Sequence, residues 1–113
     1  MSSGAAVEPS YGLDDKVVEK IRAVFSHYPG IEQVILYGSR AKGNYRNGSD
    51  IDLTFIGNGL SPETLYRLDQ ELDELLLPYT FDLSLFTDID HQGLRDHIAR
   101  VGKVFYRQGA DED

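Results

Sequence analysis

The sequence predicts an α/β fold, a two-layer single domain in which helices pack on a small mixed β-sheet. Its 113 residues suit one domain with one hydrophobic core. Helical and strand-like periodicities alternate along the chain, as in layered α/β domains. The first two predicted strands are joined by only about a dozen residues, near the minimum for a parallel crossover. Antiparallel pairing of these two strands would make the sheet mixed.

Apolar residues at steps of three and four predict a first helix between residues 13 and 28, which Pro29 and Gly30 end. Residues 1–11 are small and polar, and residues 108–113 finish in an acidic run. We therefore expect flexible termini over 1–11 and 108–113 around a folded domain of residues 12–107. The stripe of the first helix consists of Leu13, Val17, Ile21, Val24, Phe25 and Tyr28.

The first strand is predicted over residues 31–37. Its centre, Val34-Ile35-Leu36, is an apolar run rich in β-branched side chains, which suits a buried strand. Gly38 stops the strand and opens a glycine-rich, basic segment over residues 38–49. We expect a short helix in this segment before the next strand.

Two further strands are predicted over residues 50–56 and 79–86, where apolar and polar side chains alternate. In the first of them, the alternation places Asp50 and Asp52 on the polar face. In the second, Asp82 takes the same position. If the two strands are neighbours in the sheet, the three carboxylates come together.

Two more amphipathic helices complete the prediction. One covers residues 62–77, with Ser61 as its cap and Pro62 at its first position. The last begins near residues 88–90 and ends at Gly102. The predicted order is helix, strand, short helix, strand, helix, strand, helix.

Composition and charge exclude several classes of protein. Apolar residues make up 41% and charged residues 27%, as in folded globular domains. The absence of Cys excludes disulfides, thiolate metal sites and cysteine nucleophiles. A net charge of -8 argues against direct nucleic-acid binding, which depends on Lys and Arg. Without a signal peptide or a run of about eighteen apolar residues, we expect a cytoplasmic protein that does not span a membrane.

The pattern that carries chemistry is Gly38-Ser39, ten residues, then Asp50-Ile51-Asp52. Gly38 lets a ligand approach the backbone, and the Ser39 hydroxyl and N–H groups at a helix start can bind phosphate oxygens. Carboxylate oxygens are ligands that magnesium shares with substrate phosphates. Three carboxylates without a counter-charge repel one another, so this cluster suits a bound cation. A Gly-Ser turn and an Asp-x-Asp are weak signals separately, but between two predicted strands and followed by Asp82 they favour a nucleotide and metal site.

This pattern resembles the DNA polymerase β-like nucleotidyltransferase superfamily, whose signature is Gly-Ser, ten residues and Asp-x-Asp. The length of the chain and further agreement in the basic segment resemble the minimal nucleotidyltransferase branch, the antitoxins of HEPN/MNT toxin-antitoxin pairs. The resemblance implies the nucleotidyltransferase fold. The additional matching residues are Arg40, Gly43, Arg46 and Ser49.

The resemblance also implies roles for individual residues. Asp50 and Asp52 would hold two Mg²⁺ ions, and Asp82 would complete the site of one ion and help to deprotonate the acceptor hydroxyl. Arg40 and Arg46 have an alternative role, keeping the loop soluble. The implied nucleotide-binding residues are Gly38, Ser39, Arg40, Arg46 and Ser49.

The implied activity is magnesium-dependent transfer of AMP from ATP to a hydroxyl, in this branch a tyrosine of a helical HEPN-type toxin encoded nearby. No residues are left for the helical acceptor domain of larger members, and the acidic charge suits a basic partner. Two alternatives stay open: a small-molecule, aminoglycoside-like adenylyltransferase, and a non-catalytic nucleotide-binding antitoxin that acts by complex formation. The acceptor, the preference for ATP and the choice between homo- and hetero-oligomer stay open as well.

The three histidines, His27, His91 and His97, lie in or near predicted helices without the spacing of metal ligands. We expect surface or helix-end roles for them rather than catalysis.

Overall fold

The computed structural model describes residues 11–46 and 50–109. Ser49 and most of both predicted termini lie outside these ranges. Helical and extended segments alternate as the sequence predicts. In chain order the elements are α1 (Asp15–Phe25), β1 (Ile31–Tyr37), α2 (Ser39–Lys42), β2 (Ile51–Gly57), α3 (Pro62–Asp73), β3 (Phe81–Leu85), the 3-10 helix η2 (Phe86–Asp88), α4 (Gln92–Val101) and β4 (Lys103–Arg107).

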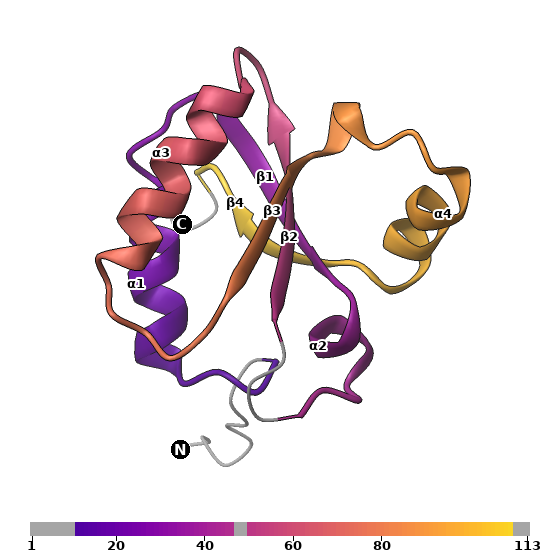
Figure 1. Ribbon diagram of the computed structural model, residues 1–113, viewed down its shortest axis with the longest axis horizontal. Helices are drawn as coiled ribbons and strands as arrows, with labels where there is room; N and C mark the ends of the chain where they lie inside the picture. Colours follow the sequence, from indigo (N-terminus) through magenta and orange to yellow (C-terminus); the bar gives the residue numbers. More distant parts are fainter. Residues whose placement is uncertain (1–10, 47–49, 110–113) are drawn as a thin grey trace.

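The four strands form one mixed sheet in the order β3-β2-β1-β4 (Figure 1). β1 pairs antiparallel with β2, which confirms what the short connection between them indicates. β2 pairs in parallel with β3, and the helix α3 forms the crossover connection between them. β1 also pairs antiparallel with β4, so β4 forms one edge of the sheet.

The strand β4 is missing from the sequence prediction, which ends with a helix. Its five residues follow Gly102 directly and contain only a short apolar run, too short to show a period. Their extended conformation depends on pairing with β1, far away in the sequence. The register shifts between Val34↔Tyr106 and Ile35↔Val104, leaving Phe105 as the extra residue of a β-bulge.

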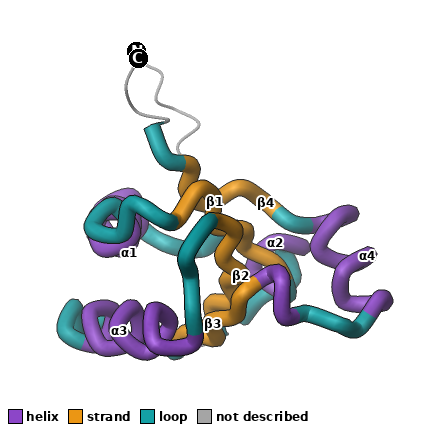
Figure 2. Tube along the Cα trace, turned by 90° about the horizontal axis from the view of Figure 1, so that it is seen from above, coloured by secondary structure: helices purple, strands orange, loops and turns teal. Residues whose placement is uncertain are grey.

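Helices lie on both sides of the sheet. The pair α1 and α3 covers one face, and α4 and the short α2 lie on the other (Figures 1 and 2). The main core is on the first side, where Phe25 of α1 packs edge-on against Phe55 of β2 with ring centroids 5.3 Å apart. Alternation along the strands therefore turns the polar positions of β2 and β3 toward the α2 and α4 side.

Helix α3 begins as predicted. The Ser61 side chain accepts a hydrogen bond from the backbone N–H of Thr64, and Pro62 occupies the first turn. The helix ends at Asp73, four residues before the predicted end, and Leu76 follows in the left-handed region with φ 58°. Within the described residues, no helix has the length and apolar character needed to cross a membrane.

Helix α4 begins at Gln92, slightly later than predicted, and follows η2 after a short extended segment. His91 caps α4, its ring nitrogen accepting a hydrogen bond from Leu94 N–H. In the first turn of α4, Arg95 donates hydrogen bonds to the carbonyls of Phe86 and Ile89, which fixes α4 against η2.

Candidate active site

The two strand-borne aspartates are direct neighbours. Asp52 of β2 and Asp82 of β3 are partners in the parallel register, so they lie on the same face of the sheet. Asp50 is exposed and precedes β2 by one residue. The structure thus brings Asp52 and Asp82 together as the sequence predicts, at the end of the sheet where β1 gives way to α2 (Figure 1).

Asp52 lies in an environment that disfavours its ionised form. Burial, together with the charges of Asp82 and Asp50, raises the pKa of Asp52 from 3.8 to about 6. A carboxylate is normally stabilised by a nearby cation, which would lower its pKa instead. Among the described residues, the charges that set the pKa of Asp52 are thus the negative charges of its two acidic neighbours.

The carboxylates of Asp50, Asp52 and Asp82 are the kind of ligand that a hard divalent cation prefers, although their positions do not form a complete metal site. Within residues 11–46 and 50–109, no three Asp, Glu or His side chains are placed so that they could hold a metal ion as they stand. Asp52 and Asp82 nevertheless present carboxylate oxygens side by side, and their repulsion is the kind that Mg²⁺ relieves. A substrate phosphate commonly supplies the remaining ligands of such an ion.

A tight turn connects β1 to α2 beside these carboxylates. We call Tyr37, Gly38 and Ser39 the Gly38 turn. Gly38 has φ 78° and ψ -156°, a conformation that residues with a side chain rarely adopt. A Cβ at this position would also overlap the Asp52 carboxylate. Both observations explain why glycine stands here.

Helix α2 begins directly after this turn. Ser39 is its first residue and is partly exposed, and the helix is closed by the hydrogen bonds from Lys42 N–H to the Gly38 carbonyl and from Gly43 N–H to the Ser39 carbonyl. Backbone N–H groups in the first turn of a helix lack intrahelical partners and can bind phosphate oxygens. Ser39 therefore lies where the sequence places a phosphate contact.

His97 of α4 also contacts the Gly38 turn. Its Nε2 accepts a hydrogen bond from Gly38 N–H at 3.2 Å, and its ring lies edge-on to Tyr37 with centroids 6.3 Å apart. The expectation of a surface or helix-end role is therefore wrong for His97, although His27 is exposed and His91 caps a helix. A signal was present, because His97 falls on the same stripe of α4 as Leu94 and Ile98.

Arg40 points into the protein. It is 3% exposed, donates from Nη1 to the Tyr11 carbonyl at 2.9 Å, and lies over the rings of Tyr45 and Tyr79. These contacts tie α2 to the chain before α1 and to the entry of β3. The structure thus favours a structural role for Arg40 over the predicted nucleotide contact. Arg46 is exposed.

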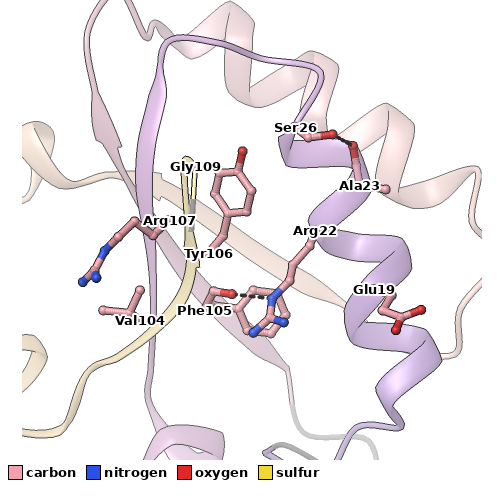
Figure 3. A pocket seen from close by; sticks show the side chains of 9 residues that line it. All are labelled: Glu19, Arg22, Ala23, Ser26, Val104, Phe105, Tyr106, Arg107 and Gly109. Atoms are coloured by element: carbon pink, nitrogen blue, oxygen red, sulfur yellow. Dashed lines mark hydrogen bonds between the residues drawn. The ribbon is translucent and has the colours of Figure 1, made fainter. Parts of the chain in front are cut away.

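A cavity of about 740 Å³ lies elsewhere, between α1 and the edge strand β4 (Figure 3). Arg22 crosses it and donates from Nε to the Phe105 carbonyl at 2.7 Å. This bond occupies a carbonyl at the bulge of β4 and thereby protects the edge of the sheet. None of the three candidate aspartates lines the cavity, so we do not assign the nucleotide site to it.

The fold and site define a class: a small mixed-sheet α/β domain with a Gly-Ser turn beside paired aspartates, the arrangement of a nucleotidyltransferase. The family described as "Polymerase beta, Nucleotidyltransferase" matches residues 19–111. The chain therefore belongs to the polymerase beta nucleotidyltransferase family. Among curated proteins, no sequence match was found.

Solved structures share the fold. A structure described as a toxin-antitoxin with AMP-PNP is 24% identical, with 84% of this chain and 77% of that chain covered and a TM-score of 0.66. A tri-AMPylated Shewanella oneidensis HEPN toxin in complex with MNT antitoxin gives 20% identity, 86% and 75% coverage and a TM-score of 0.61. The toxin-antitoxin MntA-HepT gives 20%, 88% and 77%, and 0.62. All three descriptions name a toxin-antitoxin pair, and the second names an MNT antitoxin with a HEPN toxin.

Proposed function

We propose that this protein transfers AMP from ATP to a tyrosine hydroxyl of a cognate HEPN-type toxin and acts as the antitoxin of that pair. The observation that carries the proposal is the register of Asp52 and Asp82 beside the Gly38 turn. This arrangement places carboxylates that can bind a metal ion next to a turn that can bind phosphate. The similar folds of MNT antitoxins, one of them in complex with a tri-AMPylated toxin, support the choice of acceptor.

The residues divide the work of nucleotide binding. Ser39 binds the triphosphate through its backbone N–H and its hydroxyl, and Gly38, whose own N–H donates to His97, lets the phosphates approach the backbone closely. Asp50, Asp52 and Asp82 hold Mg²⁺, which in this chemistry neutralises phosphate charge and orients the triphosphate. Arg46, exposed at the end of the basic segment, contacts the triphosphate or the acceptor, and Ser49 assists from the same loop.

The reaction is an in-line displacement at the α-phosphorus. The acceptor oxygen forms a bond to this phosphorus as the bond to the bridging oxygen of pyrophosphate breaks, and pyrophosphate leaves. Asp82 is exposed and therefore accessible to the incoming hydroxyl, whose proton it accepts. Positioning and charge stabilisation supply most of the rate enhancement, since no covalent enzyme intermediate is needed.

The acceptor is a separate protein in this proposal. A net charge of -8 favours association with a basic partner. The site is accessible to a macromolecule because Asp50 and Asp82 are both exposed. A toxin tyrosine carried on a protruding segment can therefore reach the carboxylates.

Labelling tests the proposal directly. Purified protein is incubated with Mg²⁺, α-phosphate-labelled ATP and the helical protein encoded beside it, and label on protein is located by mass spectrometry. The variant that removes the proposed metal ligands is Asp50→Ala/Asp52→Ala. Its matched control is Asp69→Ala/Asp73→Ala, which removes two exposed acids from α3.

We expect an added AMP on a partner tyrosine with wild type and control, and none with the Asp50→Ala/Asp52→Ala variant. Complex formation without label, surviving that double substitution, would instead establish a non-catalytic antitoxin. Label on an added aminoglycoside in place of the partner would establish a small-molecule adenylyltransferase.

A further inference from the structure

The Gly38 N–H group donates a hydrogen bond to a side chain that is distant in the sequence. The acceptor is Nε2 of His97, 59 residues away in the sequence, in a partly buried hydrogen bond of 3.2 Å. An imidazole nitrogen accepts only when it carries no proton, so His97 is neutral here with its proton on Nδ1. The bond fixes both the tautomer of the ring and the orientation of the Gly38 peptide.

The Gly38 turn needs such a partner. Its glycine adopts a positive φ, and glycine loses more conformational freedom on folding than any other residue. The carbonyl of Gly38 is bound by Lys42 N–H within α2, and its Cα lies against the Asp52 carboxylate. His97 supplies the remaining restraint, on the N–H side, and so selects one conformation of the peptide.

The imidazole is itself well positioned for this task. Helix α4 is braced against η2 by Arg95, whose Nε and Nη2 donate to the Ile89 and Phe86 carbonyls at 2.6 and 3.1 Å. The edge-on contact with Tyr37 holds the ring from a second direction. Tyr37 is in turn the register partner of Asp52. His97 thus joins α4 to the strand end that carries the site.

We propose that His97 is a positioning residue, which pre-organises the Gly38 turn for the triphosphate by accepting the Gly38 N–H. Its hydrogen bond is to the Gly38 N–H rather than to one of the three aspartates, so it acts through the backbone of the turn. The inference rests on the proposed function for its effect on nucleotide binding. The hydrogen bond itself can be tested without any nucleotide.

The first measurement is made on the free protein by NMR. In uniformly ¹⁵N-labelled wild type, a scalar coupling across the N–H···N bond should connect Gly38 N to His97 Nε2, and Nδ1 should carry the proton. His97→Leu removes the acceptor while keeping bulk, and His97→Gln offers an amide oxygen at a similar reach. We expect Gly38 amide exchange about tenfold faster in His97→Leu, and within about threefold of wild type in His97→Gln.

The second measurement is the affinity for ATP with Mg²⁺, by calorimetry. We expect His97→Leu to weaken binding about tenfold, the loss of one hydrogen bond, and His97→Gln to recover most of it. The matched control is His27→Leu, an exposed histidine that pairs with Glu71 at 3.0 Å and leaves the turn untouched. Thermal unfolding of each variant verifies that it is folded.

The two readouts separate the two proposals. Absence of the coupling, or unchanged Gly38 exchange in folded His97→Leu, overturns the role of His97. Tighter ATP binding in His97→Leu also overturns it, because His97 would then compete with phosphate for the N–H. Wild type that shows the coupling but does not bind ATP contradicts the proposed function and leaves the hydrogen bond established.

Discussion

Asp52 combines partial burial with two acidic neighbours, and this combination makes it the most strained ionisable group of the site. Its pKa of about 6 means that the folded protein holds a proton there under conditions in which the unfolded chain, with a value near 3.8, has released it. Stability from this group is thus fully present below about pH 4 and is lost as the pH rises through about 6. Above that range, the ionised carboxylate costs stability.

Asp52→Asn should therefore stabilise the fold at about pH 8 while abolishing nucleotidyl transfer. The gain in unfolding free energy is about 1 kcal/mol, because solvent screening reduces the effect of a half-exposed group. Below about pH 4 the gain should disappear, since Asp52 is then protonated in both states of wild type. Denaturant titrations at both pH values measure it, with Asp69→Asn as the exposed control. A gain that does not change with pH would contradict this account.

Gly38 is the second residue on which the site depends. Gly38→Ala forces a side chain into the left-handed region and against the Asp52 carboxylate. We expect a loss of about 1–3 kcal/mol in unfolding free energy and loss of nucleotide binding. Gly43→Ala is the matched control, because Gly43 also has a positive φ but a Cβ there meets nothing within 4 Å. Equal effects of both substitutions on nucleotide binding would show that overlap with Asp52 is irrelevant.

At the scale of elements, the four-residue helix α2 has too few hydrogen bonds to be stable alone. Arg40 anchors it through the Tyr11 carbonyl and the two aromatic rings of Tyr45 and Tyr79. A charge buried in this way is stabilising only while its partners are present. The helix that carries Ser39 is therefore positioned by contacts to three other segments.

Arg40→Met should lower the unfolding free energy by about 2 kcal/mol or more, because it removes a charged hydrogen bond and two cation–π contacts. Nucleotide affinity should fall with it as α2 loosens. Arg100→Met, at an exposed position of α4, serves as the control and should change neither quantity. Chemical denaturation and calorimetry measure both. A folded Arg40→Met protein of unchanged stability that has lost only nucleotide binding would restore the predicted phosphate contact.

The segment after α3 stores backbone strain. Leu76 has φ 58° yet is 88% exposed, so its side chain contributes little burial to offset an unfavourable conformation. Leu76→Asn should raise the unfolding free energy by about 0.5–1 kcal/mol, because asparagine tolerates the left-handed region. Leu75→Asn, at a partly buried neighbour packed on the core, should instead lower it. Thermal melts of both variants decide the matter.

For the whole molecule, the proposed function predicts that the acids at the end of the sheet couple folding to cation binding. A ligand that binds only the folded state stabilises it by mass action. MgCl₂ should raise the melting temperature of wild type by about 4 °C or more, compared with KCl of equal ionic strength. The rise should vanish in Asp52→Asn/Asp82→Asn. An equal rise in that variant would show that Mg²⁺ binds elsewhere.

Much of the fold followed from local patterns. Periodicity located α1, β1, β2, α3 and β3, and alternation placed Asp52 and Asp82 each on the polar face of its own strand. The parallel pairing of β2 with β3 then brings the two together. The short segment between β1 and β2 indicated their antiparallel pairing. Signals of this kind are readable because each depends on neighbours within one or two turns of the chain.

The sequence by itself thus determined the class of fold and the Gly38, Ser39 and aspartate positions of the candidate site. Only the tertiary structure decided that residues 103–107 form an edge strand, that Arg40 turns inward and that His97 reaches Gly38. These features arise from contacts between segments that are distant in sequence. A local sequence pattern cannot identify the partners that stabilise them. Periodicity shows which face of a helix or strand is buried. Only the tertiary packing decides which distant residues contact that face.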